Sequence, residues 1–456
     1  MQKRHTWSSS IAYILTVAGA TIGFGATWRF PYLVGQNGGG AYVLIFIIAM
    51  ILIGIPMLLV ENVIGRRAHR NSIDAFSPKA QQKSFSKAWT ILGYMGLIGC
   101  FGIIGYYMVL GGWVFTYIIN ILTGDLNLSS SISKTMTREF YNTQIENNPL
   151  MITLYTLIFV FLNWFVLVKG ISNGIEKAMK YLMPLLILCL IAIVIRNLTL
   201  PGAAEGIAFY LTPNFSKITP SLFVLVLGQV FFALSLGFGV MITLSSYLDK
   251  NEDLFKAAIS TGIINTIIAI LAGFMIFPSL FSFQLQPDEG PRLVFEVLPI
   301  VFSNMHFGNI LAIGFFCLLI IAAFTTSITL YEVIITVVQE KLKIGRKISV
   351  TLVLGVLFLT ANIPCIMAYG EWRDVTIIGK NIFGAFDYIS SNIFFVLTAL
   401  GSAIFVGWVL DKEAKEEVSN GLSLNAKKFV TFWFYYVKYI IPLIILIIFF
   451  GNFYIT

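Results

Sequence analysis

Eleven long apolar stretches constrain this chain more than any other feature of its sequence. A helix that crosses a bilayer needs about 20 consecutive, mostly apolar residues. Such stretches lie near 9–34, 38–65, 88–122, 150–168, 178–196, 219–248, 256–283, 307–339, 348–369, 383–410 and 429–454. Only 11% of the 456 residues are charged, against about 25% in soluble domains. The pattern predicts an all-α integral membrane protein with eleven spans and excludes a soluble fold.

The distribution of basic residues orients the spans, because cytoplasmic loops of membrane proteins carry an excess of Lys and Arg. If the residues before the first span are cytoplasmic, 21 of the 30 Lys and Arg lie in inner loops and seven in outer loops. The net charge of +8 therefore reflects topology and does not indicate a nucleic-acid partner. We expect a multi-pass protein of the cell inner (plasma) membrane, in contact with lipids, with its N-terminus in the cytoplasm and its C-terminus outside.

Spans one and six carry glycine pairs near their centres, Gly23-Phe24-Gly25 and Gly237-Phe238-Gly239. Glycine costs about 1 kcal/mol in a helix interior, and unwound backbone at membrane depth is tolerated only where it lines a cavity. Paired breaks favour two inverted repeats around a transporter's central site. We expect one domain, 1–456, with repeats at about 9–196 and 219–410 and an extra span at about 429–454. Glycines that only permit close helix packing are the alternative.

Ionisable and hydroxyl side chains also interrupt the apolar runs. Arg29, Glu61 and Asp387 lie within spans, where charged groups are costly and are functional by default. Arg29 and Asp387 lie toward the outer ends of their spans and can pair across a vestibule, whereas Glu61 can satisfy backbone groups that the breaks release. The hydroxyls of Thr325-Thr326-Ser327 in span 8 would ordinarily bond to their own helix. Beside two broken helices they would supply oxygen ligands for a hard cation.

Longer motifs resemble a known family. The runs Trp28-Arg29-Phe30-Pro31-Tyr32 and Asn37-Gly38-Gly39-Gly40-Ala41 closely resemble the neurotransmitter:sodium symporter family of the LeuT type. Gly54-Ile55-Pro56, Tyr106-Tyr107 and Ser235–Gly239 fit the same family, and the likeness runs from Trp7 into span 11. It implies a LeuT-type 5+5 inverted repeat with broken spans 1 and 6, plus an eleventh span.

The resemblance further implies where a substrate binds. An amine would contact backbone carbonyls near Ala20, Phe232 and Ser235. A carboxylate would face the Tyr107 hydroxyl and backbone amides in the first break, where helix N-termini favour an anion. The implied substrate-binding residues are Ala20, Gly23, Phe24, Gly25, Ile103, Tyr107, Phe232, Ser235, Phe238, Thr326 and Leu330. Their apolar side chains suit an aliphatic or aromatic amino acid.

The same resemblance implies a sodium ion and two gates. The family's second sodium site corresponds to the carbonyls of Gly19, Ile22 and Ala322 and the hydroxyls of Thr325 and Thr326. The outer gate corresponds to Arg29 with Asp387. The inner gate corresponds to Arg4 with Glu340, beside a latch of Trp7 and Tyr247.

Two ion sites of the family depart from its pattern. At the first sodium site, Ala26 and Ala233 replace an Asn and a hydroxyl residue, which leaves Asn265 and the oxygens of Thr21. A buried cation with so few ligands has an uncompensated desolvation cost, so we expect this site to be lost, or rebuilt with the Thr21 or Thr27 hydroxyl. At the chloride site Phe46 replaces a tyrosine, and Ala233 and Ala269 supply no donor. We therefore expect no chloride dependence.

The sequence thus predicts a sodium-coupled symporter for a small hydrophobic amino acid that works by alternating access, with one sodium ion and without chloride. Two alternatives use the same fold: a proton-coupled or uncoupled carrier of an amino acid or amine, and a sensor or channel that does not transport. An enzyme is not expected, because the sequence has no nucleophile–base pair, metal-ligand cluster or cofactor motif.

Overall fold

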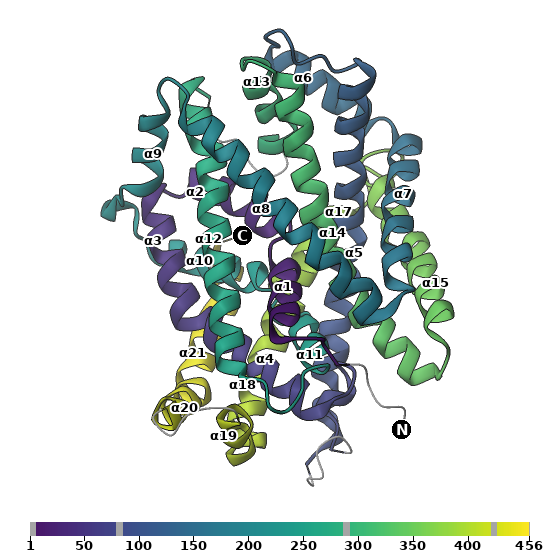
Figure 1. The fold of residues 1–456 in the computed structure, drawn as a ribbon, viewed down its shortest axis with the longest axis vertical. Coiled ribbons are helices and arrows are strands. Elements are labelled where there is room, and N and C mark those ends of the chain that lie inside the picture. The colour runs from purple at the N-terminus through teal and green to yellow at the C-terminus, as the bar shows by residue number, and fades with distance from the viewer. Residues whose placement is uncertain (1–5, 79–84, 286–291, 421–425, 456) are drawn as a thin grey trace.

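The computed structural model describes residues 6–78, 85–285, 292–420 and 426–455. Within these residues, nine helical segments are long and apolar enough to cross a membrane, and a bent helix pair forms a tenth candidate. The helices run roughly side by side in one bundle, with α6 and α13 at one end and α19 and α20 at the other (Figure 1). This architecture agrees with the all-α membrane fold that the apolar stretches predict.

The helices of the first half of the chain have the following bounds. They are α1 (Ser10–Thr21), α2 (Phe30–Gln36), α3 (Gly40–Ala49), α4 (Ile55–Ala68), α5 (Thr90–Thr123), α6 (Lys134–Tyr141), α7 (Pro149–Leu167), α8 (Lys177–Leu198) and α9 (Ala203–Leu211). Wider π-helical turns at Gly25–Arg29, Met50–Gly54, Asn142–Glu146 and Ile171–Glu176 continue four of these helices.

The second half follows a similar order. It contains α10 (Pro220–Ala233), α11 (Val240–Ser245), α12 (Leu254–Ser282), α13 (Leu298–Ser303), α14 (Gly308–Leu342), α15 (Arg346–Leu357), α16 (Ile363–Met367), α17 (Ile382–Tyr388), α18 (Phe395–Ile404), α19 (Lys412–Ser419), α20 (Ala426–Tyr435) and α21 (Ile441–Ile455). A short antiparallel hairpin of β1 (Thr376–Ile377) and β2 (Lys380–Asn381) pairs Thr376 with Asn381.

Both predicted breaks are present. In the first span α1 ends at Thr21, and the segment Gly25–Gln36 leaves at 52° to it. In the sixth span α10 and α11 are separated by residues 234–239, so the crossing expected at 219–248 consists of two short helices. Ser235, Gly237 and Gly239 have φ angles of 52°, 81° and 76°. Glycine adopts this left-handed region without steric cost, so the glycine pair permits the break.

Polar and proline residues fix where several helices begin. The Thr219 side chain accepts a hydrogen bond from the Leu222 N–H (3.2 Å) directly before Pro220, the first residue of α10. Asn148 caps α7 in the same way, ahead of Pro149. Proline at the first helical position has no N–H to leave unsatisfied. Both helices therefore begin where the sequence supplies a cap followed by a proline.

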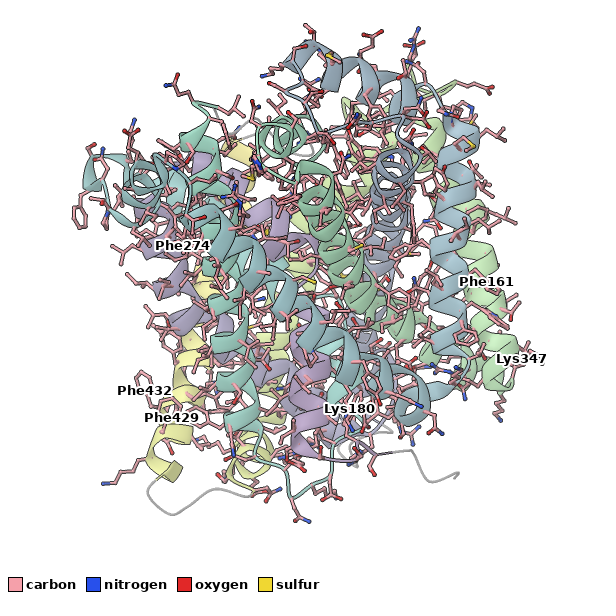
Figure 2. The ribbon with its side chains drawn as sticks, turned by 45° about the horizontal axis from the view of Figure 1, so that its top comes forward. Phe161, Lys180, Phe274, Lys347, Phe429 and Phe432 are labelled. Atoms are coloured by element: carbon pink, nitrogen blue, oxygen red, sulfur yellow. The ribbon has the colours of Figure 1, made fainter. Side chains whose placement is uncertain are left out.

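Apolar side chains cover the outside of the bundle. Phe161, Phe429 and Phe432 lie on its periphery (Figure 2), with exposed fractions of 60%, 45% and 64%. In water such a surface would be costly, whereas lipid tails are themselves apolar. The exposed aromatic residues therefore agree with a lipid-facing surface.

Candidate substrate and cation site

Side chains from neighbouring helices hold the two breaks against each other. The Ser235 hydroxyl donates to the Ala20 carbonyl at 3.1 Å and thereby joins the second break to the end of α1. The Gln229 amide on α10 donates to the Gly25 carbonyl at 2.7 Å. Glu61 on α4 accepts the Gly237 N–H at 2.6 Å, which confirms that it satisfies backbone released by the second break. Buried backbone groups need such partners, so these side chains stabilise the unwound segments.

The first break lies against Tyr107 of α5. The Phe24 N–H donates to the Tyr107 hydroxyl at 3.1 Å. A Cβ atom at Gly23 would overlap that hydroxyl and the Thr326 hydroxyl, and one at Gly25 would lie 2.9 Å from the Phe232 ring. Glycine is therefore needed at both positions because α5, α14 and α10 approach the unwound backbone closely. The structure brings together Gly23, Phe24, Gly25, Tyr107, Phe232 and Thr326.

A cavity of about 130 Å³ lies directly beside this cluster. Seven aromatic side chains form most of its wall, and one leucine, one arginine and one aspartate complete it: Phe24, Trp28, Arg29, Tyr32, Tyr106, Tyr107, Leu110, Phe232, Phe383 and Asp387. Of the eleven predicted substrate residues, Phe24, Tyr107 and Phe232 line this cavity. The other eight are buried but do not line it: Ala20, Gly23, Gly25, Ile103, Ser235, Phe238, Thr326 and Leu330.

Sequence reasoning missed part of this wall. Trp28 and Tyr32 belong to the motif that carried the family resemblance, and Tyr106 precedes the predicted Tyr107. Their positions in these motifs were a usable signal. Leu110 lies one helical turn beyond Tyr107, while Phe383 comes from a distant helix and has no local signal.

The predicted second sodium site lies where α14 contacts the end of α1. The Thr326 hydroxyl donates to the Gly19 carbonyl at 3.1 Å, across the two helices. The Thr325 hydroxyl donates to the Ala322 carbonyl at 3.0 Å, and Ile22 follows the last residue of α1. All five residues are buried. Carbonyl and hydroxyl oxygens are the donors that a hard cation prefers, and the Thr326–Gly19 contact brings one of each together.

Asn265 on α12 occupies the position of the predicted first sodium site. Its amide nitrogen donates to the Thr21 carbonyl at 2.9 Å and to the Ala233 carbonyl at 3.2 Å. The Thr21 hydroxyl donates to the Ala18 carbonyl at 2.9 Å, and the Thr27 hydroxyl to the Gly23 carbonyl at 3.2 Å. Both hydroxyls therefore bond to their own span, and Asn265 presents donors to the carbonyls on either side of it.

The predicted outer pair, Arg29 with Asp387, is not formed in this structure, although both residues are described and line the same cavity. The Arg29 guanidinium lies over the Phe232 ring, 4.3 Å from its centroid. Asp387 instead accepts hydrogen bonds from Tyr106 at 2.8 Å and Ser391 at 3.1 Å. A guanidinium gains electrostatic attraction over an aromatic face, so Phe232 and Tyr106 keep the two charges apart.

At the opposite end the predicted latch is closed. The Trp7 indole N–H donates to the Leu244 carbonyl at 3.0 Å, and its ring packs edge-on against Tyr247 at 6.2 Å. Arg4, the predicted partner of Glu340, lies outside the described residues. Glu340 accepts hydrogen bonds from the Asn71 side chain at 2.7 Å and its backbone N–H at 3.2 Å.

The sequence did not predict a second ion pair beside this latch. Arg346 binds both carboxylate oxygens of Glu332, at 2.9 and 2.5 Å. The Tyr247 hydroxyl donates to the same carboxylate at 3.1 Å. Glu332 is fully buried in α14 and bonds to both Arg346 and Tyr247, so the ion pair and the latch belong to one hydrogen-bond network. In the sequence, the position of the acidic residue Glu332 near the end of a long apolar helix was a sign that it needs a buried partner.

The bundle and its paired breaks define a membrane transporter with a LeuT-type fold. A crystal structure of MhsT in complex with L-phenylalanine superimposes with a TM-score of 0.88 at 36% sequence identity, covering 98% of this chain and all of that one. The family model described as the sodium:neurotransmitter symporter family matches residues 4–155 and 147–455. The chain belongs to this family, and so it is a sodium-dependent transporter and not an enzyme.

Two bacterial relatives agree with this assignment. A protein of Haemophilus influenzae described as an uncharacterized sodium-dependent transporter is 62% identical over 99% of this chain and 98% of its own length. The sodium-dependent transporter YhdH of Bacillus subtilis, also described as uncharacterized, is 39% identical over 98% of this chain and 97% of its own length.

Proposed function

We propose that this transporter is a symporter that imports a small hydrophobic amino acid, aliphatic or aromatic, with one sodium ion and without chloride. The observation that carries the proposal is the contact of the Thr326 hydroxyl with the Gly19 carbonyl at the end of α1, beside the buried Thr325. The sodium ion would bind the Gly19, Ile22 and Ala322 carbonyls and the two threonine hydroxyls. Because these ligands come from α1 and α14, binding would tie the broken span to a continuous helix. An ion that binds one conformation better than another shifts the population toward it.

The first break supports the placement of the substrate. The Phe24 N–H donates to the Tyr107 hydroxyl at 3.1 Å, and this hydroxyl would in turn donate to a carboxylate beside the first break. The carbonyls near Ala20, Phe232 and Ser235 would take the amine. The aromatic wall of the adjacent cavity suits an apolar side chain. The complex of MhsT with L-phenylalanine supports the same substrate class.

The geometry at Asn265 supports a single sodium ion. Its amide hydrogens already satisfy the Thr21 and Ala233 carbonyls, while Ala26 and Ala233 have no side-chain oxygen. A sodium ion at this position would have few ligands, namely those two carbonyls and the Asn265 Oδ1, which has no hydrogen-bond partner among the described residues. In a buried site that shortage is costly, so we propose that a neutral amide replaces the first sodium ion.

The orientation and the repeats complete the proposal. The excess of Lys and Arg in the loops at the Trp7 end supports a cytoplasmic N-terminus, an outside C-terminus and location in the cell inner membrane. The two breaks support repeats at about 9–196 and 219–410, with an extra span at about 429–454 in a single domain. The cavity beside Arg29 and Asp387 would then open toward the outside.

Replacing Thr325 with Val tests the cation site, because valine keeps the shape of threonine and removes the oxygen. In proteoliposomes with a sodium gradient, we expect Thr325→Val to raise the half-saturating sodium concentration about tenfold or more, as disturbed metal sites do. Thr329→Val is the matched control, because Thr329 is equally buried and bonds to its own helix at 2.7 Å. Unchanged sodium dependence in Thr325→Val, or uptake driven by a pH gradient alone, contradicts the proposal.

A further inference from the structure

The short helix α19, between the last two spans, is tied to the inner end of the bundle by a buried arginine. The Arg66 side chain at the end of α4 is 0% exposed, and its Nε donates to the Glu417 carboxylate of α19 at 2.6 Å. One terminal nitrogen donates to the Glu417 carbonyl and the other to the Glu252 carbonyl, just before α12. A buried charge is strongly unfavourable unless it is fully paired. Arg66 therefore holds three separate segments together.

One face of α19 makes all of these contacts. Ala414 and Val418, four residues apart, are 0% and 1% exposed. Glu413 and Glu417 are also four residues apart and pair with Arg67 and Arg66. Residues at this spacing lie on the same side of a helix. The helix is thus docked through an apolar row and a row of ion pairs, at the end of the bundle opposite α6 and α13 (Figure 1).

Glu252 connects this docked helix to the latch of the transporter. Its carbonyl accepts from Arg66, and its carboxylate accepts the Ser10 hydroxyl. Ser10 is the first residue of α1 and lies three residues after Trp7. The neighbouring Ser8 is bound by the Glu176 carboxylate through its hydroxyl and, at 3.2 Å, its backbone N–H. Two acidic residues, Glu176 and Glu252, therefore fix the segment that directly follows Trp7.

We propose that Arg66 and Glu417 are positioning residues for the transport cycle, which place Glu252 so that it holds Ser10 and keeps the inner side closed. The inference rests on the proposed alternating-access function. Opening the inner side must separate Trp7 from Leu244 and Tyr247, and the bond between Ser10 and Glu252 breaks with it. The Arg66–Glu417 contact persists, because it lies between elements that do not include α1. A bond present in only one state biases the equilibrium toward that state.

The test measures how often the inner side opens. Val17 of α1 is 1% exposed, and a Val17→Cys reporter in a chain without its four native cysteines would react with a maleimide only after opening. In inside-out vesicles without substrate, we expect Glu252→Gln, which removes the charge of the acceptor, and Ser10→Ala, which removes the donor, to raise the labelling rate about three- to tenfold, in line with the weakening or loss of one exposed hydrogen bond. Glu417→Gln should raise it as well, whereas Ser10→Thr, which keeps the hydroxyl, should match the parent chain.

Glu413→Gln is the matched control. It weakens an ion pair of the same helix with α4, but this pair does not touch Glu252. If Glu413→Gln raises labelling as much as Glu417→Gln, or if Glu252→Gln leaves the rate unchanged, the inference is overturned. Protection of the reporter by sodium in the parent chain reports on the proposed function separately. Sodium protection without an effect of Glu252→Gln refutes only the positioning role, and the reverse result refutes only sodium coupling.

Discussion

Replacing Glu332 with Gln tests the ion pair that accompanies the latch. Glu332 is fully buried and makes two bonds to Arg346, one to Tyr247 and one to Thr336 at 3.0 Å. Glutamine keeps the size of the side chain but leaves Arg346, whose side chain is 20% exposed, without a counter-charge. Breaking a buried pair by removing one partner costs about 3–5 kcal/mol. For 456 residues the unfolding entropy is about 1 kcal/mol/K, so we expect Tm to fall by about 3–5 °C.

The assay can use the protein's own thiols. Cys100 and Cys365 are both 0% exposed, so a thiol-reactive dye reports unfolding in detergent once the partly exposed Cys189 and Cys317 are replaced. Lys341→Gln is the control, because the pair of Lys341 with Asp74 is partly exposed, at 41% and 24%, and such pairs contribute about 0–1 kcal/mol. The double variant Glu332→Gln/Arg346→Gln should melt above Glu332→Gln, since no charge is then left buried. A double variant whose loss equals the sum of the two single losses would refute this reasoning.

Three further predictions concern the substrate, packing and anion dependence. Tyr107→Phe should weaken amino-acid binding by about tenfold or more, because one hydrogen bond to a charged group is lost. If calorimetric titration finds the same affinity in the variant, the substrate carboxylate does not bind Tyr107. Gly40→Ala should lower Tm, because its Cβ would lie 2.6 Å from the Thr212 backbone, whereas Gly314→Ala, with open space around it, should leave Tm unchanged or raise it; equal shifts contradict the packing argument. Uptake should continue when gluconate replaces chloride, and its collapse would show that a chloride site exists.

The breaks could be predicted because their causes are local. Glycine pairs in spans one and six allow left-handed backbone. Glu61 lies within the second span, which crosses the membrane at the same depth as the breaks. The hydroxyls of Thr325 and Thr326 could be predicted for the same reason, since an apolar helix leaves few polar positions to consider.

Pairings between distant segments could not be read from the sequence. Arg66 and Glu417 are 351 residues apart. Each lies beside a loop at the end of a helix, where charged residues are common, so neither position stands out in the sequence. The position of Arg29 over Phe232 depends on a rotamer choice between two favourable partners, an aromatic face and the Asp387 carboxylate. Asn265 illustrates the same limit, because its sequence position predicts proximity to Thr21 but not which end of the amide faces the carbonyls.

The orientation of Asn265 has a thermodynamic consequence that can be measured directly. A zwitterion that enters with one sodium ion moves one net charge, and a membrane potential of 100 mV contributes about 2.3 kcal/mol per charge. A tenfold sodium gradient contributes about 1.4 kcal/mol. One sodium ion therefore supports an accumulation of about 500-fold under these conditions, whereas two would support about 10⁵-fold. Because the Asn265 amide satisfies the Thr21 and Ala233 carbonyls, we expect the limit in tight proteoliposomes to match one ion. Accumulation clearly above 500-fold would require a second cation and would contradict the proposal that the Asn265 amide replaces it.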